Sequence, residues 1–154
     1  MSKLGFTKRD NYTRCKSSAL YSLAMREHSR KELSQKLQKK EYVEGVDVEQ
    51  LLNELEENDY LNETRFAESF VRYRSSRGQG LVKISNELRN RGISDYLINR
   101  VIEDSDVNWF DLATEQLQKK FGKSKSVDFK EKSKRMRFLS SRGFTSEIIH
   151  SIVE

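Results

Sequence analysis

Apolar residues recur three and four positions apart along most of the chain, which is the spacing of amphipathic helices. The sequence has no proline and few glycines, so we expect helices joined by short connections and no β-strands. Their limits are uncertain by about 2–4 residues. The predicted helices lie near residues 11–27, 29–40, 47–58, 63–76, 80–91, 94–104, 107–121, 128–141 and 145–153.

One apolar pattern occurs twice, as RGISDYLINRVI and as RGFTSEIIHSIV, at a constant offset of 51 residues. Gly92 follows the apolar face of a helix and is suited to a left-handed stop, after which Ile93 folds back onto Leu88. Ser94 then caps the next helix. The second copy places Leu139, Gly143, Phe144 and Thr145 in the same roles. Each copy therefore predicts a corner between two helices.

A looser third copy lies near the N-terminus, with Leu33 and Leu37 before the corner and Glu41-Tyr42 in place of glycine and an apolar residue. Each corner is preceded by a further helix, so the helices group into three units of three. One unit has too little apolar surface to be stable alone, so we expect neighbours to pack in an elongated array. The predicted domains are 1–60, 61–105 and 106–154.

Composition narrows the class of protein. Apolar residues make up 35% and charged residues 34%, with a net charge of +5. The apolar runs are too short to span a membrane, and the first residues lack the apolar segment of a signal peptide. A single cysteine, Cys15, favours a reducing compartment. These features predict a cytoplasmic protein, and nothing suggests a stable oligomer.

Charge alternates in phase with the repeat. Residues 46–63 carry seven acidic and no basic side chains, and residues 101–115 carry five acidic and no basic ones. The segments before, between and after them have net charges of +6, +5 and +6. A solvated helical surface also produces charge runs, but the alternation favours repeated basic surfaces that bind a polyanion or an alternately charged polymer.

The sequence offers little support for catalysis. His28 and His150 lie in different units without further ligands at metal-binding spacing, and the one short Gly-Gln-Gly stretch does not follow a strand. Tyr73 continues the spacing of Phe66 and Phe70, so we expect it in the core rather than stacked on a base. Trp109 and Phe110 are expected to fill a seam between units, and Cys15 to be partly buried. The prediction is a protein without catalytic, metal-binding or cofactor-binding residues.

The stretch DYLNETRFAESFVRYRSSRGQGLVKISNELRNRGIS resembles the signature of the RecX family, bacterial regulators of the RecA recombinase. AMREHSRKELSQKL and KRMRFLSSRGF resemble the family at the two ends, so the resemblance covers nearly the whole chain. Glu41-Tyr42 departs from the family, which usually has glycine followed by an aromatic residue there.

This resemblance implies a negative regulator that binds RecA–single-stranded DNA filaments and blocks their growth, which lowers ATPase, strand-exchange and co-protease activity. RecA, single-stranded DNA and double-stranded DNA are the expected partners, and the chain is expected to act as a monomer. The basic residues expected to contact RecA or DNA are Arg26, Arg30, Lys31, Lys36, Lys39 and Lys40 in the first unit, Arg72, Arg74, Arg77, Lys83, Arg89 and Arg91 in the second, and Lys119, Lys120, Lys130, Lys134, Arg135 and Arg137 in the third.

Two other classes of protein stay open at this point. Three-helix units with such corners are common in proteins that read DNA or RNA directly, although no helix here concentrates Arg, Asn and Gln as a groove-reading helix would. The acidic run from Glu54 to Asp59 suggests a metal-dependent nuclease, although its side chains spread around a helix and no second carboxylate motif accompanies them.

Overall fold

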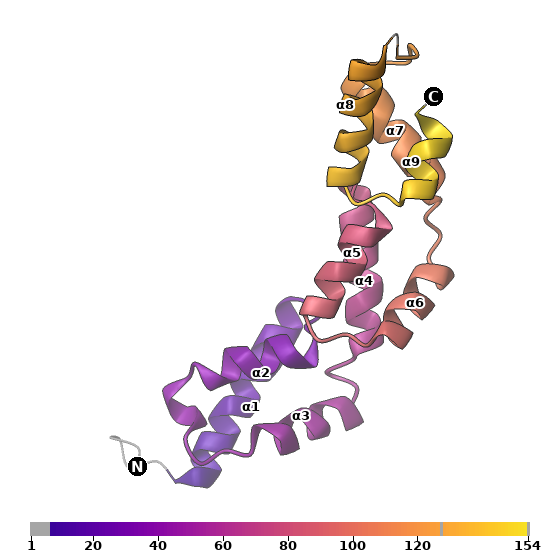
Figure 1. Ribbon diagram of the computed structural model, residues 1–154. Helices are drawn as coiled ribbons and strands as arrows, with labels where there is room; N and C mark the ends of the chain where they lie inside the picture. The colour runs from indigo at the N-terminus through magenta and orange to yellow at the C-terminus, as the bar shows by residue number, and fades with distance from the viewer. Residues whose placement is uncertain (1–6, 127, 154) are drawn as a thin grey trace. The chain divides into compact units, whose positions relative to one another are not determined.

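The structure is a computed structural model and describes residues 7–126 and 128–153. Every regular element in these residues is a helix (Figure 1), and none is long and apolar enough to cross a bilayer. The predicted helices are all present, with ends within about three residues of the expected ones. Their bounds are α1 (Lys8–Met25), α2 (Arg30–Gln38), α3 (Val48–Glu57), α4 (Glu63–Ser76), α5 (Leu81–Asn90), α6 (Asp95–Asp104), α7 (Trp109–Phe121), α8 (Phe129–Ser141) and α9 (Ser146–Ile152), with a 3₁₀ turn, η1 (Glu41–Val43).

Side-chain caps fix where several helices begin. The hydroxyls of Ser94 and Thr145 each accept a hydrogen bond from the backbone N–H three residues further on, as predicted. Helix α1 begins earlier than the apolar pattern indicated, because Thr7 and Asp10 form a reciprocal capping box that satisfies two backbone donors at its start.

The two predicted glycine corners are confirmed. Gly92 and Gly143 have φ angles of 88° and 95°. At the later corner the N–H of Gly143 donates to the Ser140 carbonyl at 3.0 Å, and the N–H of Phe144 donates to the Leu139 carbonyl at 3.2 Å, which is the Schellman pattern. The apolar residues of the two corners are buried alike: Leu88, Ile93 and Ile98 in one, Leu139, Phe144 and Ile149 in the other.

The first corner is built differently. Helix α2 ends at Lys39, which has αR backbone angles, and Lys40 is extended. The chain then makes the 3₁₀ turn of η1, and the left-handed residue comes only at Gly45, with a φ of 75°. Glu41 and Tyr42 therefore need no positive φ, which explains why this position tolerates the departure from glycine.

The described residues divide into two compact units. Unit 1 contains the chain up to Ala67 together with Arg91–Ile93, and unit 2 contains Glu68–Asn90 and the residues from Ser94 onward. The core of unit 1 is formed by α1, α2, α3 and the following turn; its buried members are Cys15, Ala19, Leu33, Leu37, Val48, Leu51, Leu52, Leu55 and Leu61. Within unit 2, helices α7, α8 and α9 enclose a second core made of Ala113, Leu117, Leu139, Phe144, Ile149 and Val153.

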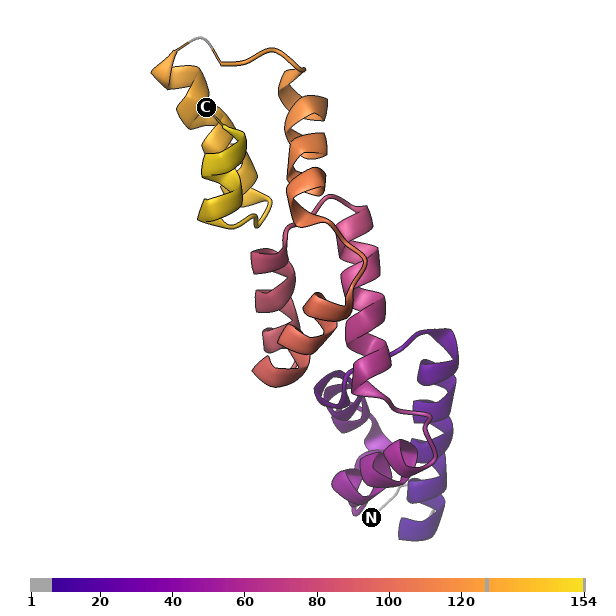
Figure 2. The same ribbon diagram turned by 90° about the vertical axis from the view of Figure 1, so that its right-hand side faces the viewer.

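A direct backbone contact joins the second and third repeats inside unit 2. The N–H groups of Gly80 and Val82, at the start of α5, donate to the carbonyls of Arg142 and Gly143, just after α8, at 2.7 and 2.9 Å. Figures 1 and 2 both place the start of α5 beside the end of α8. A Cβ on Gly80 would lie 2.5 Å from the Gly143 carbonyl carbon, so the contact depends on glycine. The free donors of one helix thereby satisfy the free acceptors of another.

Two expectations about single residues need correction. Phe110 is 46% exposed and Trp109 is half-buried, so Phe110 does not fill a seam. Both stand in the first turn of α7, where only part of a helix faces its neighbours. Cys15, expected to be partly buried, has no exposed surface; its Sγ lies 3.6 Å from the Tyr42 carbonyl, and burial raises the pKa of the thiol.

Candidate interaction surface

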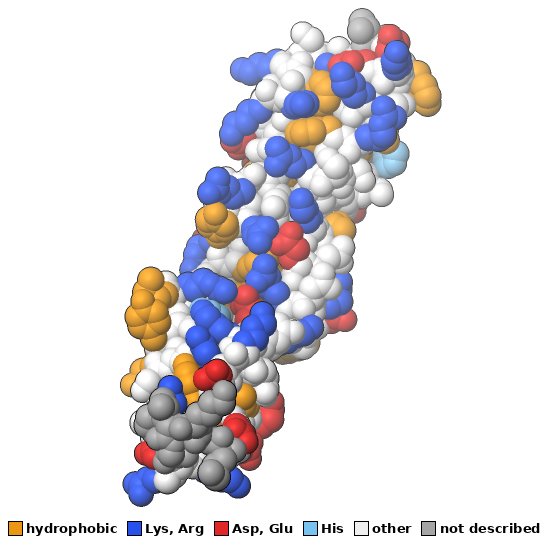
Figure 3. Space-filling model, turned by 90° about the vertical axis from the view of Figure 1, so that its left-hand side faces the viewer, with side chains coloured by type: hydrophobic (Ala, Val, Ile, Leu, Met, Phe, Trp, Pro, Cys, Tyr) orange, Lys and Arg blue, Asp and Glu red, His pale blue; other side chains and the backbone are white. Residues whose placement is uncertain are grey.

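The middle helix of each repeat presents basic side chains to solvent. In α5, Ile84 and Leu88 are buried and Lys83 and Arg89 are exposed, because residues four apart share one helix face. Helices α2 and α8 follow the same rule, with leucines inside and lysines outside. Within unit 2, Figure 3 shows Lys and Arg side chains over α5 and α8, with few Asp or Glu among them. The repeat thus turns an inner apolar stripe into an outer basic one.

Many of the predicted contact residues are exposed and form no ion pair with another residue in the described part of the chain. A cation without a carboxylate partner can neutralise an external anion at no cost in internal pairing. These residues are Lys36, Lys39, Arg72, Arg77, Lys83, Lys120, Lys130, Lys134 and Arg137.

Other predicted contact residues are engaged inside the protein. Arg30, 25% exposed, pairs with Glu49 and Glu56, each at 2.7 Å. Arg74 pairs with Glu87 at 2.9 Å, and its guanidinium carbon lies 4.7 Å from the centre of the Phe70 ring. These two arginines hold helices together, and binding an external anion would require breaking those pairs. More exposed pairs join Arg89 to Asp95 and Lys119 to Glu115.

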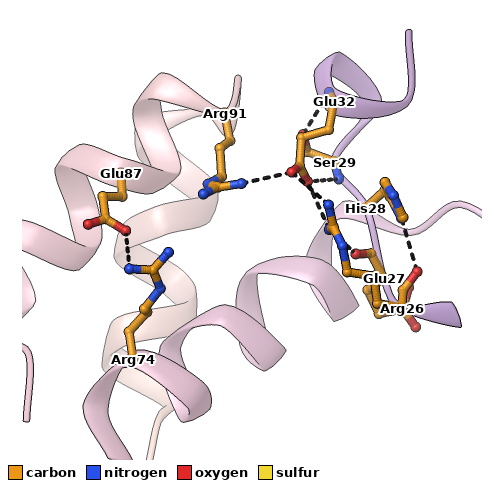
Figure 4. Close-up of polar contacts among 8 residues, drawn as sticks. All are labelled: Arg26, Glu27, His28, Ser29, Glu32, Arg74, Glu87 and Arg91. Atoms are coloured by element: carbon orange, nitrogen blue, oxygen red, sulfur yellow. Dashed lines mark hydrogen bonds and ion pairs between the residues drawn. The ribbon is translucent and has the colours of Figure 1, made fainter. Parts of the chain in front are cut away.

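Glu32 is the most connected carboxylate of unit 1 (Figure 4). It accepts hydrogen bonds from the backbone N–H of Ser29 at 3.1 Å, from Arg26 at 3.2 Å and from Arg91 at 2.7 Å. Burial raises the pKa of Glu32, but the Ser29 N–H and the two guanidiniums outweigh burial and hold the pKa below its ordinary value. Arg26 and Arg91, both predicted contact residues, therefore stabilise the start of α2, and Lys31 lies beside Gly92 at the same place.

Replacing Glu32 with glutamine should lower the free energy of unfolding at pH 7 by about 1–3 kcal/mol, because two guanidiniums no longer have their charged acceptor. The folded-state pKa lies below the unfolded value of about 4.3. This stabilisation is therefore complete above that pH and disappears as pH falls through the folded-state pKa. Denaturant melts from pH 7 to 3 should converge for wild type and E32Q. The control E49Q, at a carboxylate 72% exposed, should change stability by less than about 0.5 kcal/mol. An E32Q deficit that persists at pH 3 would contradict the assignment.

Arg135 was expected on the contact surface, but the structure places it inside. Its side chain is 9% exposed. The guanidinium donates to the Ser124 carbonyl at 2.7 Å and to Glu131 at 3.2 Å, and lies 5.3 Å from the Phe121 ring centre. Arg135 shares the buried face of α8 with Leu139, four residues on. It orders the connection between α7 and α8 and is left out of the surface.

Tyr73 was expected in the core and is instead 56% exposed. Ala67 and Val71 are buried beside Phe66 and Phe70, and they move the middle of the apolar stripe roughly a quarter turn away from Tyr73. The tyrosine hydroxyl accepts a hydrogen bond from Arg77 at 3.0 Å, and the guanidinium carbon lies 5.2 Å from the ring centre. An aromatic ring and a cation are thus paired on the outer face of α4.

Phe129 is a second exposed aromatic residue that the sequence did not single out. It is 84% exposed at the first position of α8 and precedes the exposed Lys130. The signal available in the sequence was a phenylalanine directly after the N-cap Asp128, in a segment rich in lysine. Exposed aromatic rings next to cations are the combination that single-stranded nucleic acids contact.

The two carboxylates of the nuclease alternative are occupied by neighbours. Glu54 accepts hydrogen bonds from Lys16, at 2.6 Å, and from the hydroxyl of Tyr12; these two contacts lower the pKa of Glu54. Asp59 accepts hydrogen bonds from Asn62 and Arg65, each at 2.9 Å. Both carboxylates serve contacts within unit 1.

Comparison with known proteins gives the same three-repeat organisation. The family models described as the first, second and third three-helix domains of RecX match residues 15–55, 62–102 and 106–153. A protein named Regulatory protein RecX from Halorhodospira halophila is 42% identical over 136 residues, which are 88% of this chain and 84% of that one. Another of this name from Actinobacillus pleuropneumoniae is 36% identical, over 89% of this chain and 88% of that one.

A solved structure supports the fold. The crystal structure of RecX from Lactobacillus salivarius superimposes with a TM-score of 0.77 at 24% identity, over 94% of this chain and 95% of that one. Three consecutive domain matches, relatives similar over most of their length, and the helix–corner pattern described above agree. This chain belongs to the RecX family of regulatory proteins.

Proposed function

We propose that this chain is a negative regulator of the RecA recombinase that binds RecA–single-stranded DNA filaments and blocks their growth. Membership of the RecX family, over all three repeats, is the observation that carries the proposal. ATPase, strand-exchange and co-protease activities of RecA would fall as a consequence, because each depends on the filament.

The exposed cations without internal partners are the proposed contacts. They recur on the outer faces of α2, α4, α5 and α8, so one chain offers several separate points of attachment. Such spacing suits a filament, which repeats both DNA phosphates and protein surface along its length. Arg72 and Arg77, with Tyr73 between them, are the proposed central contact, since the two arginines flank an exposed aromatic ring.

A pull-down with RecA, with and without single-stranded DNA, tests this function. We expect the chain to retain more RecA when the DNA is present, because the filament presents its binding sites repeatedly. Retention of DNA alone, with a sharp consensus after selection from random sequences, would instead favour a direct DNA- or RNA-binding regulator of the helix–turn–helix type. Equal failure to retain RecA in both conditions would refute the proposal.

A further inference from the structure

Unit 2 contains an open groove that the proposed function does not use. Helix α4 forms one side, and the end of α6, the α6–α7 connection and the start of α7 form the other. Its volume is about 710 Å³, which is within the range of ligand-binding sites in proteins. Val71, Val101, Val107 and Leu112 contribute its apolar lining. The groove is therefore large enough, and apolar enough, to take side chains of a partner.

The rim of this groove is strongly acidic in a chain whose net charge is +5. Five carboxylates line it against a single guanidinium, that of Arg72. Glu68, Asp106 and Asp111 form no ion pair within the part of the chain that the structure describes. The other two, Asp104 and Glu115, make only exposed pairs with residues outside the groove, at 3.9 and 3.2 Å. Their negative charge is thus left largely uncompensated.

Helix ends reinforce this charge. Helix α6 ends at Asp104 beside the groove, with Ser105 as its cap, and the last carbonyls of a helix favour a cation. Helix α7 begins there with the opposite polarity, but the side chain of Asn108 accepts a hydrogen bond from the Asp111 N–H at 3.0 Å and satisfies one of its free donors. A cationic ligand is favoured and a nucleic acid backbone is repelled.

From the apolar lining and the uncompensated carboxylates we infer that the groove between α4, α6 and α7 binds a basic segment of a partner protein. Two or three apolar side chains of that segment enter the groove while its Lys and Arg side chains meet the acidic rim. An amphipathic helix with apolar residues at i, i+3 and i+4 has this chemistry, and the charge complementarity steers its association. The inference goes beyond the proposed function and does not depend on RecA being the partner.

The test uses a fluorescent 12-residue amphipathic peptide with leucines on one helical face and lysines elsewhere, titrated into the full chain. The variant E68Q/D106N/D111N removes the three unpaired carboxylates of the groove. The control E57Q/E103Q/E147Q removes the same charge from exposed sites outside it, and Glu147, like Asp111, lies in the first turn of a helix. Thermal melts establish that both variants fold.

We expect the groove variant to bind the peptide at least about tenfold more weakly than wild type, and the control variant to bind it less than about threefold more weakly. Changing the leucines of the peptide to serine should also abolish binding, and added salt should weaken it. Equal weakening in both variants would mean that only net charge attracts the peptide, and would overturn the inference. Absence of wild-type binding, displacement by single-stranded DNA, or a self-association that the groove variant abolishes would overturn it too.

Discussion

Replacing Gly143 with valine should lower the free energy of unfolding by at least about 3 kcal/mol. Gly143 has a φ of 95°, which strains a β-branched residue. Its Cβ would also lie 2.4 Å from the Cβ of Lys83 and 2.8 Å from the Lys83 backbone nitrogen. Relief would require moving α5, whose Val82 N–H donates to the Gly143 carbonyl. Chemical denaturation followed by circular dichroism measures the destabilisation.

Gly92→Val is the matched comparison, because Gly92 holds the same place in the preceding repeat. Its φ of 88° imposes similar strain, but the added Cβ would approach only the Lys31 side chain, at 2.9 Å. A flexible lysine can move, so this destabilisation should exceed about 1 kcal/mol and stay below that of Gly143→Val. Unchanged melting of both variants would contradict the corner geometry, and equal destabilisation would contradict the close approach of α5 to the Gly143 corner.

Changing Arg72 and Arg77 to glutamine should weaken binding to the RecA filament at least about tenfold, if each arginine meets a phosphate or a carboxylate. Both are exposed on α4, and glutamine nearly preserves helix propensity. Arg74 is left in place because its pair with Glu87 stabilises the fold. With single-stranded DNA as partner, the slope of log affinity against log salt should flatten by about 0.7 for each phosphate that the variant no longer neutralises. With acidic protein as partner, affinity for bare DNA should barely change.

Arg9→Gln with Arg100→Gln provides a control of equal charge change. Arg9 is exposed on α1, and Arg100 on α6 donates to the Tyr96 hydroxyl at 3.3 Å, four residues before it, as Arg77 does to Tyr73. The control should retain filament affinity within about threefold. If the Arg72/Arg77 variant stalls filament growth at wild-type concentrations, these arginines are only a solvated face.

Local chemistry explains how much of the fold the sequence predicts. Gly143 and Thr145 act within one turn of their own helices, so their roles can be recognised from neighbouring residues alone. Thr7 and Asp10 also have the spacing of a capping box, yet the start of α1 was placed later because its apolar pattern begins later. Residues that differ from expectation, such as Tyr73, depend on which face of a helix its neighbours cover, and that is a tertiary property.

The candidate surface was predictable as a set of basic stripes but not residue by residue. Arg30 finds Glu49 and Glu56 on another helix, and Arg91 finds Glu32 far away in the sequence, so local spacing cannot reveal that they are paired. The groove has a similar origin. The acidic run of residues 101–115 is evident in the sequence, but Glu68 joins it only when α4 packs nearby. The domain limits 1–60, 61–105 and 106–154 stay predictions.

The growth of fluorescent RecA filaments on single-stranded DNA, observed one filament at a time, tests the central claim most directly. The chain is added at concentrations well below that of RecA, alongside the Arg72/Arg77 double variant and the Arg9/Arg100 control. The account predicts that wild type and control stop filament extension, and that the double variant needs at least about tenfold more protein to do so. Filaments that extend at an unchanged rate while wild-type chain saturates the bare DNA would contradict it.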